Sequence, residues 1–240
     1  MKAQERHHLK QNEFAITTAK LAGTVAENRS QILMIGGGVL LVGVIAGGWF
    51  YLQKQKNDAA NALFGAAMRV EQSQIVPAPT LPGATQQAGT FATEQARNEA
   101  AVAAYQKVID AYPSHDVGLV AKFHLAGIYL SMGRAADAAT AYADVASRGG
   151  GSMVGSTAKL GQAQALVAQS KFDEAIKVLT DLSGQRDGEL PMDGVLMELA
   201  RVCQRAGKTQ DARAAFKRVV DEFPQSGYAG EARQQLATMG

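Results

Sequence analysis

The residues best suited to ligate a metal are four histidines, His7, His8, His115 and His124, and one cysteine, Cys203. Catalytic zinc sites draw on short motifs such as HExxH, in which two histidines share one helix face, and the sequence contains no such motif. The first two histidines lie in a polar N-terminal segment, and the other two have no cysteine or histidine cluster beside them. We therefore expect no metal site.

A phosphate-binding loop is the next chemistry to consider. The tripeptide GKT at 207–209 resembles the end of such a loop, but the loop requires a glycine five residues before Gly207, and Val202 stands there. We interpret GKT as a turn between two helices. The sequence also has no nucleophile elbow and no paired-carboxylate motif. We expect a protein that is not an enzyme and that uses no cofactor.

The charges of the chain are balanced. Residues 1–31 hold five of the 24 Lys and Arg residues and three of the 22 Asp and Glu residues, which leaves 19 of each for residues 53–240. A neutral domain argues against nucleic acid as a partner. The single cysteine excludes a fold that is built on internal disulfides.

Residues 32–52 form 21 consecutive positions without a charged side chain. A helix of this length spans about 30 Å, which matches the hydrocarbon core of a bilayer. Trp49, Phe50 and Tyr51 near its end are aromatic residues that prefer the membrane interface. A cleaved signal peptide is the main alternative, but its apolar core would be shorter and would end in small residues. We predict a single transmembrane helix at 32–52 after a polar tail at 1–31.

Three glycines of this segment, Gly36, Gly43 and Gly47, lie close to one stripe of the predicted helix. Such a stripe permits close contact between membrane helices, so a homo-oligomer is possible. The alternative is that glycine is simply frequent in membrane helices. The basic residues of the tail favour a cytoplasmic N-terminus, with the domain at 53–240 outside.

Residues 53–240 contain an internal repeat of 37 residues. A small residue and, four positions later, a bulky residue recur at this interval, which is typical of a helical solenoid whose units are helix pairs. The small positions are Ala101, Ala138, Ala175 and Ala212, and the bulky ones are Tyr105, Tyr142, Leu179 and Phe216.

The repeat resembles the tetratricopeptide repeat family, whose units combine Leu with a small residue, an aromatic, a Gly turn, Ala, a second aromatic and a closing Pro. A middle unit fits more loosely, with Ser170 at the turn position. The two best matches are Leu125, Ala126, Tyr129, Gly133, Ala138 and Tyr142 in one unit and Leu199, Ala200, Gly207, Ala212, Phe216 and Pro224 in the other.

The resemblance implies an all-α fold, in which the predicted transmembrane helix precedes an α-solenoid of about four helix pairs. The first pair is split, because a Pro- and Gly-rich insertion at 77–93, expected to be a loop or disordered, separates a helix within 57–75 from one at about 94–111. Residues 225–240 are expected to form a capping helix, which covers the last apolar face of a solenoid.

A groove lined by the first helix of each unit is the expected binding site of such a solenoid. The inner positions, 37 residues apart, are Phe123, Leu160 and Met197, and their neighbours are Leu130, Gln164, Val167, Arg201 and Arg205. This apolar column lacks the Lys, Asn and Arg clamp with which some family members bind acidic C-terminal peptides, so apolar or extended segments are the expected ligands. The alternative is that these side chains pack against the insertion or an adjacent repeat.

The whole architecture resembles the YfgM-type ancillary subunits of the bacterial Sec translocon. This resemblance implies a single-pass inner-membrane protein with a periplasmic domain that helps pass or hold secreted chains. Its partners would be translocon subunits, periplasmic chaperones or unfolded secreted chains, with lipid around one helix. A second hypothesis is an envelope scaffold, similar to the repeat proteins that organise outer-membrane assembly or coordinate division.

Overall fold

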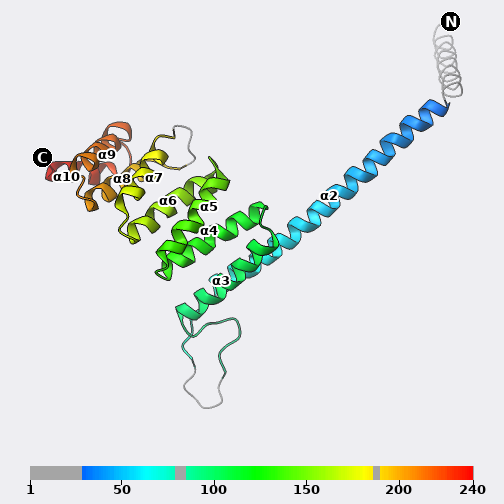
Figure 1. Ribbon diagram of the computed structural model, residues 1–240, viewed down its shortest axis with the longest axis horizontal. Helices are drawn as coiled ribbons and strands as arrows, with labels where there is room; N and C mark the ends of the chain where they lie inside the picture. The colour runs from blue at the N-terminus through cyan, green and yellow to red at the C-terminus, as the bar shows by residue number, and fades with distance from the viewer. Residues whose placement is uncertain (1–28, 79–84, 186–189, 240) are drawn as a thin grey trace, which may run out of the picture. The chain divides into compact units, whose positions relative to one another are not determined.

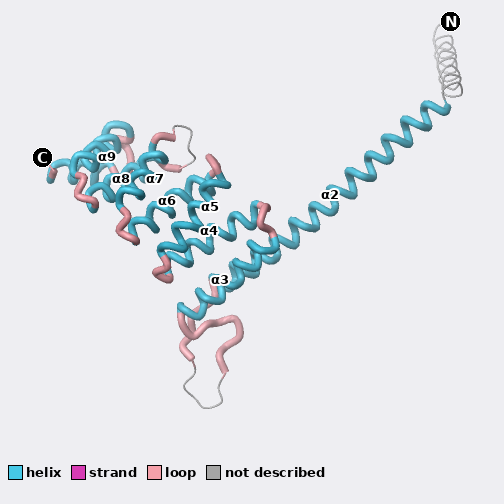
Figure 2. Tube along the Cα trace, in the orientation of Figure 1, coloured by secondary structure: helices cyan, strands magenta, loops and turns pink. Residues whose placement is uncertain are grey.

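The computed structural model describes residues 29–78, 85–185 and 190–239, without the side chains of 29–33, 35–37 and 39. Within these ranges the chain consists of α-helices and loops, with one isolated β-bridge between Ile75 and Phe91 (Figure 2). The predicted all-α class is confirmed. The helices are α2 (Arg29–Glu71), α3 (Glu94–Ala111), α4 (Asp116–Ser131), α5 (Ala135–Gly149), α6 (Met153–Ala168), α7 (Phe172–Ser183), α8 (Met192–Arg205), α9 (Thr209–Glu222) and α10 (Ala229–Thr238).

The chain divides into two compact units, Met1–Asp58 and Ala59–Gly240, and α2 contributes residues to both. Among the residues that the structure describes, no helix is both long enough and apolar enough to cross a membrane. The tail predicted at 1–31 lies, up to residue 28, outside the described residues. So do the side chains of six positions in the predicted span, Ile32, Leu33, Ile35, Gly36, Gly37 and Val39.

In the second unit, each helix from α3 to α9 packs against the next one along the chain (Figure 1). The repeat explains this packing, because every 37 residues the same positions turn inward. All four alanines of the small column, Ala101, Ala138, Ala175 and Ala212, have 0 % exposed surface. The four bulky residues that follow them are buried as well, and three of the four are fully buried. The predicted period and its helix pairs are thus confirmed.

The turns inside the three complete pairs share one backbone conformation. Gly133, Ser170 and Gly207, which are 37 residues apart, have φ angles of 74°, 60° and 73°. In each turn the next residue donates its backbone N–H to the carbonyl five residues earlier, as Arg134 does to Tyr129 at 2.8 Å. These bonds satisfy carbonyls at the helix end and form the Schellman motif that favours glycine. GKT at 207–209 is therefore a helix–helix turn, as expected.

The first pair is split as predicted, and its helix boundaries are now defined. The end of α2 acts as its first helix and stops at Glu71, four residues before the predicted limit, while α3 has the predicted bounds. The ends of the insertion are held together, because Val76 donates to the Phe91 carbonyl at 2.9 Å and Phe91 donates to Gln74 at 3.0 Å. Residues 79–84 of the predicted insertion lie outside the described residues.

Candidate functional site

Three of the predicted groove residues, Leu160 and Gln164 of α6 and Arg201 of α8, line one pocket of about 430 Å³. We call it the α6–α8 pocket. It combines side chains from two consecutive repeats with Tyr228, which precedes the capping helix α10. Its remaining lining residues are Leu190, Pro191, Asp193, Gly194, Val195 and Glu198.

The pocket has an apolar wall with an aromatic residue at its rim. Leu160 is half-buried and packs against the main core of the last repeats, and Val195 is almost fully buried. Tyr228 is 40 % exposed, so its ring is available to a ligand. A volume of about 430 Å³ lies within the range of about 300–1,000 Å³ in which proteins hold small ligands or parts of larger ones.

Among the described residues that line this pocket, Arg201 is the only cationic one, and Glu231 of α10 forms an ion pair with it. Its guanidinium donates to the two carboxylate oxygens of Glu231 at 2.8 and 2.9 Å. These hydrogen bonds, together with the charges of Glu231 and Glu198, raise the pKa of Arg201. The same guanidinium lies 6.0 Å from the centre of the Tyr228 ring. Arg201 is therefore held in place and its charge is balanced.

Two carboxylates of the pocket form no ion pair among the described residues. Asp193 accepts hydrogen bonds from its neighbour Gly194 at 2.9 Å and from the Ser226 hydroxyl at 2.6 Å, both of which are neutral donors. The half-buried Glu198 takes part in no hydrogen bond or ion pair within the part of the chain that the structure describes. The described lining residues of the pocket therefore carry excess negative charge beside an apolar wall.

The other predicted groove residues do not line this pocket. The half-buried Phe123 packs its ring against Tyr142, at 5.5 Å between centroids. Leu130 and Val167 are partly buried against two core clusters, and Arg205 is exposed.

The prediction that Met197 lines an open groove does not match its position, because Met197 has 0 % exposed surface. It belongs to the core that includes Phe216 of α9 and Ala232 of α10. Met197 therefore fits the alternative interpretation, in which the side chain at the inner position packs against adjacent helices. The helix face of α8 that meets the pocket instead carries Glu198 and Arg201, three residues apart.

Sequence reasoning missed Asp193, Glu198 and Tyr228. Glu198 directly follows the predicted inner position and precedes Arg201 by one helical turn, so the helical period could have identified it. Asp193 lies in the first turn of α8. Tyr228 directly precedes the cap, and the residue 37 positions before it is Pro191, so the alignment of the repeats does not predict an aromatic residue there.

The glycines predicted to mediate contact between membrane helices remain a prediction. Gly36 lies outside the residues whose surroundings are described. A Cβ atom at Gly43 or Gly47 would meet nothing within 4 Å. Both positions are therefore sterically open to a partner helix.

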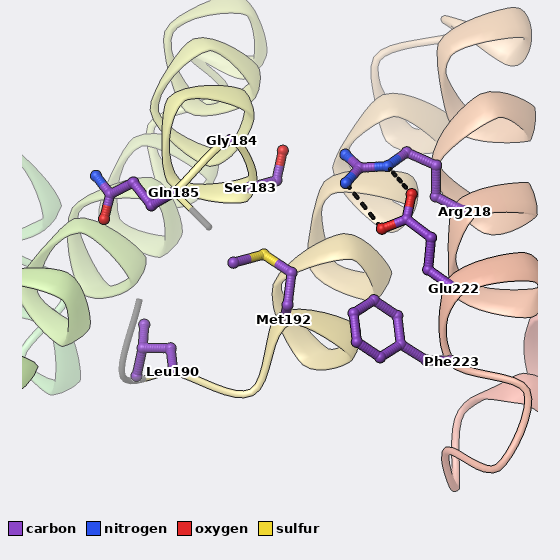
Figure 3. A pocket seen from close by; sticks show the side chains of 8 residues that line it. All are labelled: Ser183, Gly184, Gln185, Leu190, Met192, Arg218, Glu222 and Phe223. Carbon is purple, nitrogen blue, oxygen red and sulfur yellow. Dashed lines mark hydrogen bonds and ion pairs between the residues drawn. The ribbon is translucent and has the colours of Figure 1, made fainter. Parts of the chain in front are cut away.

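A second pocket, of about 670 Å³, lies where the end of α7 and the start of α8 face α9 (Figure 3). Its charged lining residues cancel each other, because Arg218 donates to both carboxylate oxygens of Glu222 at 2.7 and 3.1 Å. This pair lowers the pKa of Glu222. The lining residues that the structure describes in this second pocket hold no unpaired charge, so the α6–α8 pocket is the better candidate site.

A cluster of polar and aromatic side chains joins α2, α3 and α4. The Tyr105 hydroxyl donates to the Glu71 carboxylate, which also lies 3.2 Å from Nδ1 of His124. Burial, followed by the hydrogen bond and charge of Glu71, raises the pKa of Tyr105. Its ring stacks on His124 at 5.4 Å and is fully buried. The cluster fastens the end of α2 to the first complete repeat and lines none of the pockets described here.

Within the described residues, no three His, Cys, Asp or Glu side chains come together in a group that could hold a metal ion.

The fold is similar to solved structures of repeat proteins. One is a Podosopora anserina protein with nearly identical TPR-like repeats of the kinesin light chain type, which is 16 % identical, with a TM-score of 0.55, over 75 % of this chain and 84 % of that one. Another is BtubC (BKLC) from P. vanneervenii, 17 % identical, with a TM-score of 0.51, over 61 % of this chain and 66 % of that one. At these identities the likeness shows the fold alone.

No match was found among curated protein sequences. The tetratricopeptide repeat-like domain, in contrast, matches residues 26–239, which is most of the chain and includes every complete repeat described above. Together with the 37-residue period and the shared turns, this match identifies the chain as a member of the tetratricopeptide repeat-like domain family.

Proposed function

We propose that this protein is a membrane-anchored, non-catalytic module that binds protein partners in its α6–α8 pocket. Repeat solenoids of this family are protein–protein interaction modules. The observation that carries the proposal is the pocket itself, which has an apolar wall and fixed polar groups and draws its lining from two consecutive repeats and the cap. The partner would be an extended segment of another protein.

The membrane anchor is the second part of the proposal. Its support is the uncharged stretch at 32–52 together with the surface of α2. The nine large apolar side chains from Leu40 to Leu52 are 55–69 % exposed and include the aromatic residues Trp49, Phe50 and Tyr51. So large an apolar surface on one helix is unfavourable in water and favourable in lipid. A lipid bilayer would surround this apolar surface with hydrocarbon on all sides of the helix.

The specific place of action follows from the resemblance to YfgM-type subunits. We propose a bacterial inner-membrane protein with a periplasmic domain, which acts beside the Sec translocon and takes up segments of secreted chains, alone or with periplasmic chaperones. Residues 32–52 would keep the pocket among partners that arrive at the membrane. Protease digestion of the repeat domain in spheroplasts, but not in intact cells, is the expected result for this orientation.

Photocross-linking in native membranes tests the site and the partner together. A photoreactive phenylalanine analogue would replace Gln164, which is exposed in the pocket, or Thr180, which is exposed on α7 and serves as the control position. We expect translocon subunits or secreted chains to cross-link at position 164 and not at position 180. Cross-links to envelope-assembly proteins would favour the scaffold hypothesis instead. Equal cross-linking at both positions would refute a binding role for the pocket.

A further inference from the structure

The charges of the α6–α8 pocket point to a specific class of ligand. Glu198 and Asp193 form no ion pair among the described residues, and Arg201, which is paired with Glu231 and also lies in the field of Glu198, is a single cation against three carboxylates. Both unpaired carboxylates line the same cavity. A carboxylate in a partly buried cavity gains most from a cation that replaces the water it has lost.

We propose that the pocket binds a lysine or arginine side chain that projects from an extended apolar segment of a polypeptide. This inference rests on the proposed function and adds the chemistry of the ligand. It is opposite in sign to the clamp for acidic C-terminal peptides, because the excess charge here is negative.

The apolar wall accounts for the rest of the ligand. Leu160 and Pro191 can contact the aliphatic stem of a long cationic side chain, while its charged end reaches the carboxylates. The exposed ring of Tyr228 offers a face on which a cation is also favourable, as its contact with Arg201 already indicates. A segment with apolar residues beside one basic residue thus satisfies both parts of the pocket.

Binding of three fluorescent peptides to the full-length protein in detergent micelles tests this proposal. The peptides would share one apolar sequence and differ at a single central residue, which is Lys, Gln or Glu. We expect the Lys peptide to bind about fivefold more tightly than the Gln peptide at low ionic strength, and the Glu peptide to bind most weakly. High salt should reduce this difference, because it screens partly exposed charges.

The variant Glu198→Gln should remove most of the preference for Lys, so that the Lys and Gln peptides bind with similar affinities. Glu174→Gln is the matched control, since Glu174 is an exposed carboxylate of α7 outside the pocket. Equal affinities for the three peptides, or a preference that survives in Glu198→Gln, would overturn the proposal.

The two proposals can fail separately. If none of the peptides binds while cross-links from position 164 persist, the cationic ligand is refuted and the binding role stands. If the cross-links are absent as well, both proposals fall.

Discussion

At the residue scale, the turns at Gly133, Ser170 and Gly207 place glycine and serine in the same left-handed backbone conformation. Ser170 has a φ of 60° and is the only non-glycine residue with a positive φ among the described residues. Placing a residue that has a Cβ atom in the left-handed region of φ and ψ costs roughly 1–2 kcal/mol. The hydrogen bonds of the turn nevertheless match those of its two counterparts, with Lys171 donating to Leu166 at 2.9 Å. The packing of α6 on α7 therefore holds Ser170 in a strained conformation.

The variant Ser170→Gly should relieve this strain. The gain is partly offset by the greater freedom of glycine in the unfolded chain, so we expect a net stabilisation of up to about 1 kcal/mol. The melting temperature of the full-length protein in detergent, followed by circular dichroism, should rise by about 2–4 °C. The reverse change at an equivalent turn, Gly207→Ser, should lower it. A fall in melting temperature for Ser170→Gly would contradict the strain.

At the element scale, close approach of helices depends on small residues at fixed positions. The column of four buried alanines is one example. Gly161 of α6 is another, because a Cβ atom there would lie 2.6 Å from the Tyr142 ring of α5. Its counterparts at this repeat position are His124 and Glu198, so the 37-residue pattern could not have predicted a small residue. Glycine is required at position 161 because the Tyr142 ring occupies the space that a Cβ atom would need. The spacing of residues in the sequence does not predict such a contact.

Helix α9 offers a controlled test of the alanine column. Ala212 is fully buried, whereas Ala214 is exposed on the same helix. We expect Ala212→Leu to destabilise the protein by about 1–3 kcal/mol, because the larger side chain separates two packed helices. Ala214→Leu should have little effect, since helix propensities of Ala and Leu are similar. Urea unfolding of both full-length variants measures the difference, and equal midpoints would refute close packing at this column.

At the scale of the whole molecule, the sequence predicted the repeat better than it predicted the site. The 37-residue period identified the helix pairs because burial recurs at every unit, from Ala101 to Ala212. The pocket, in contrast, depends on features that do not recur. Tyr228 and Glu231 come from the cap and the residue before it, and Glu231 forms the ion pair that neutralises Arg201. The same cap contributes Ala232 to the core that encloses Met197. The end of a solenoid therefore differs from its repeats in both shape and charge.

The apolar surface of α2 gives the prediction that concerns the molecule as a whole. If residues 32–52 lie in a bilayer, wild-type protein should stay in the membrane pellet after an alkaline carbonate wash. The double variant Val42→Lys, Ile45→Lys should be released, since each lysine near the centre costs about 2.5–3.5 kcal/mol. Gln53→Lys with Gln55→Lys adds the same charge beyond the predicted span, where lysine can reach the lipid headgroups, and should be retained. Release of the wild-type protein by the wash would mean that α2 binds the membrane surface or a protein partner, and the role of residues 32–52 as a membrane-spanning anchor would be refuted.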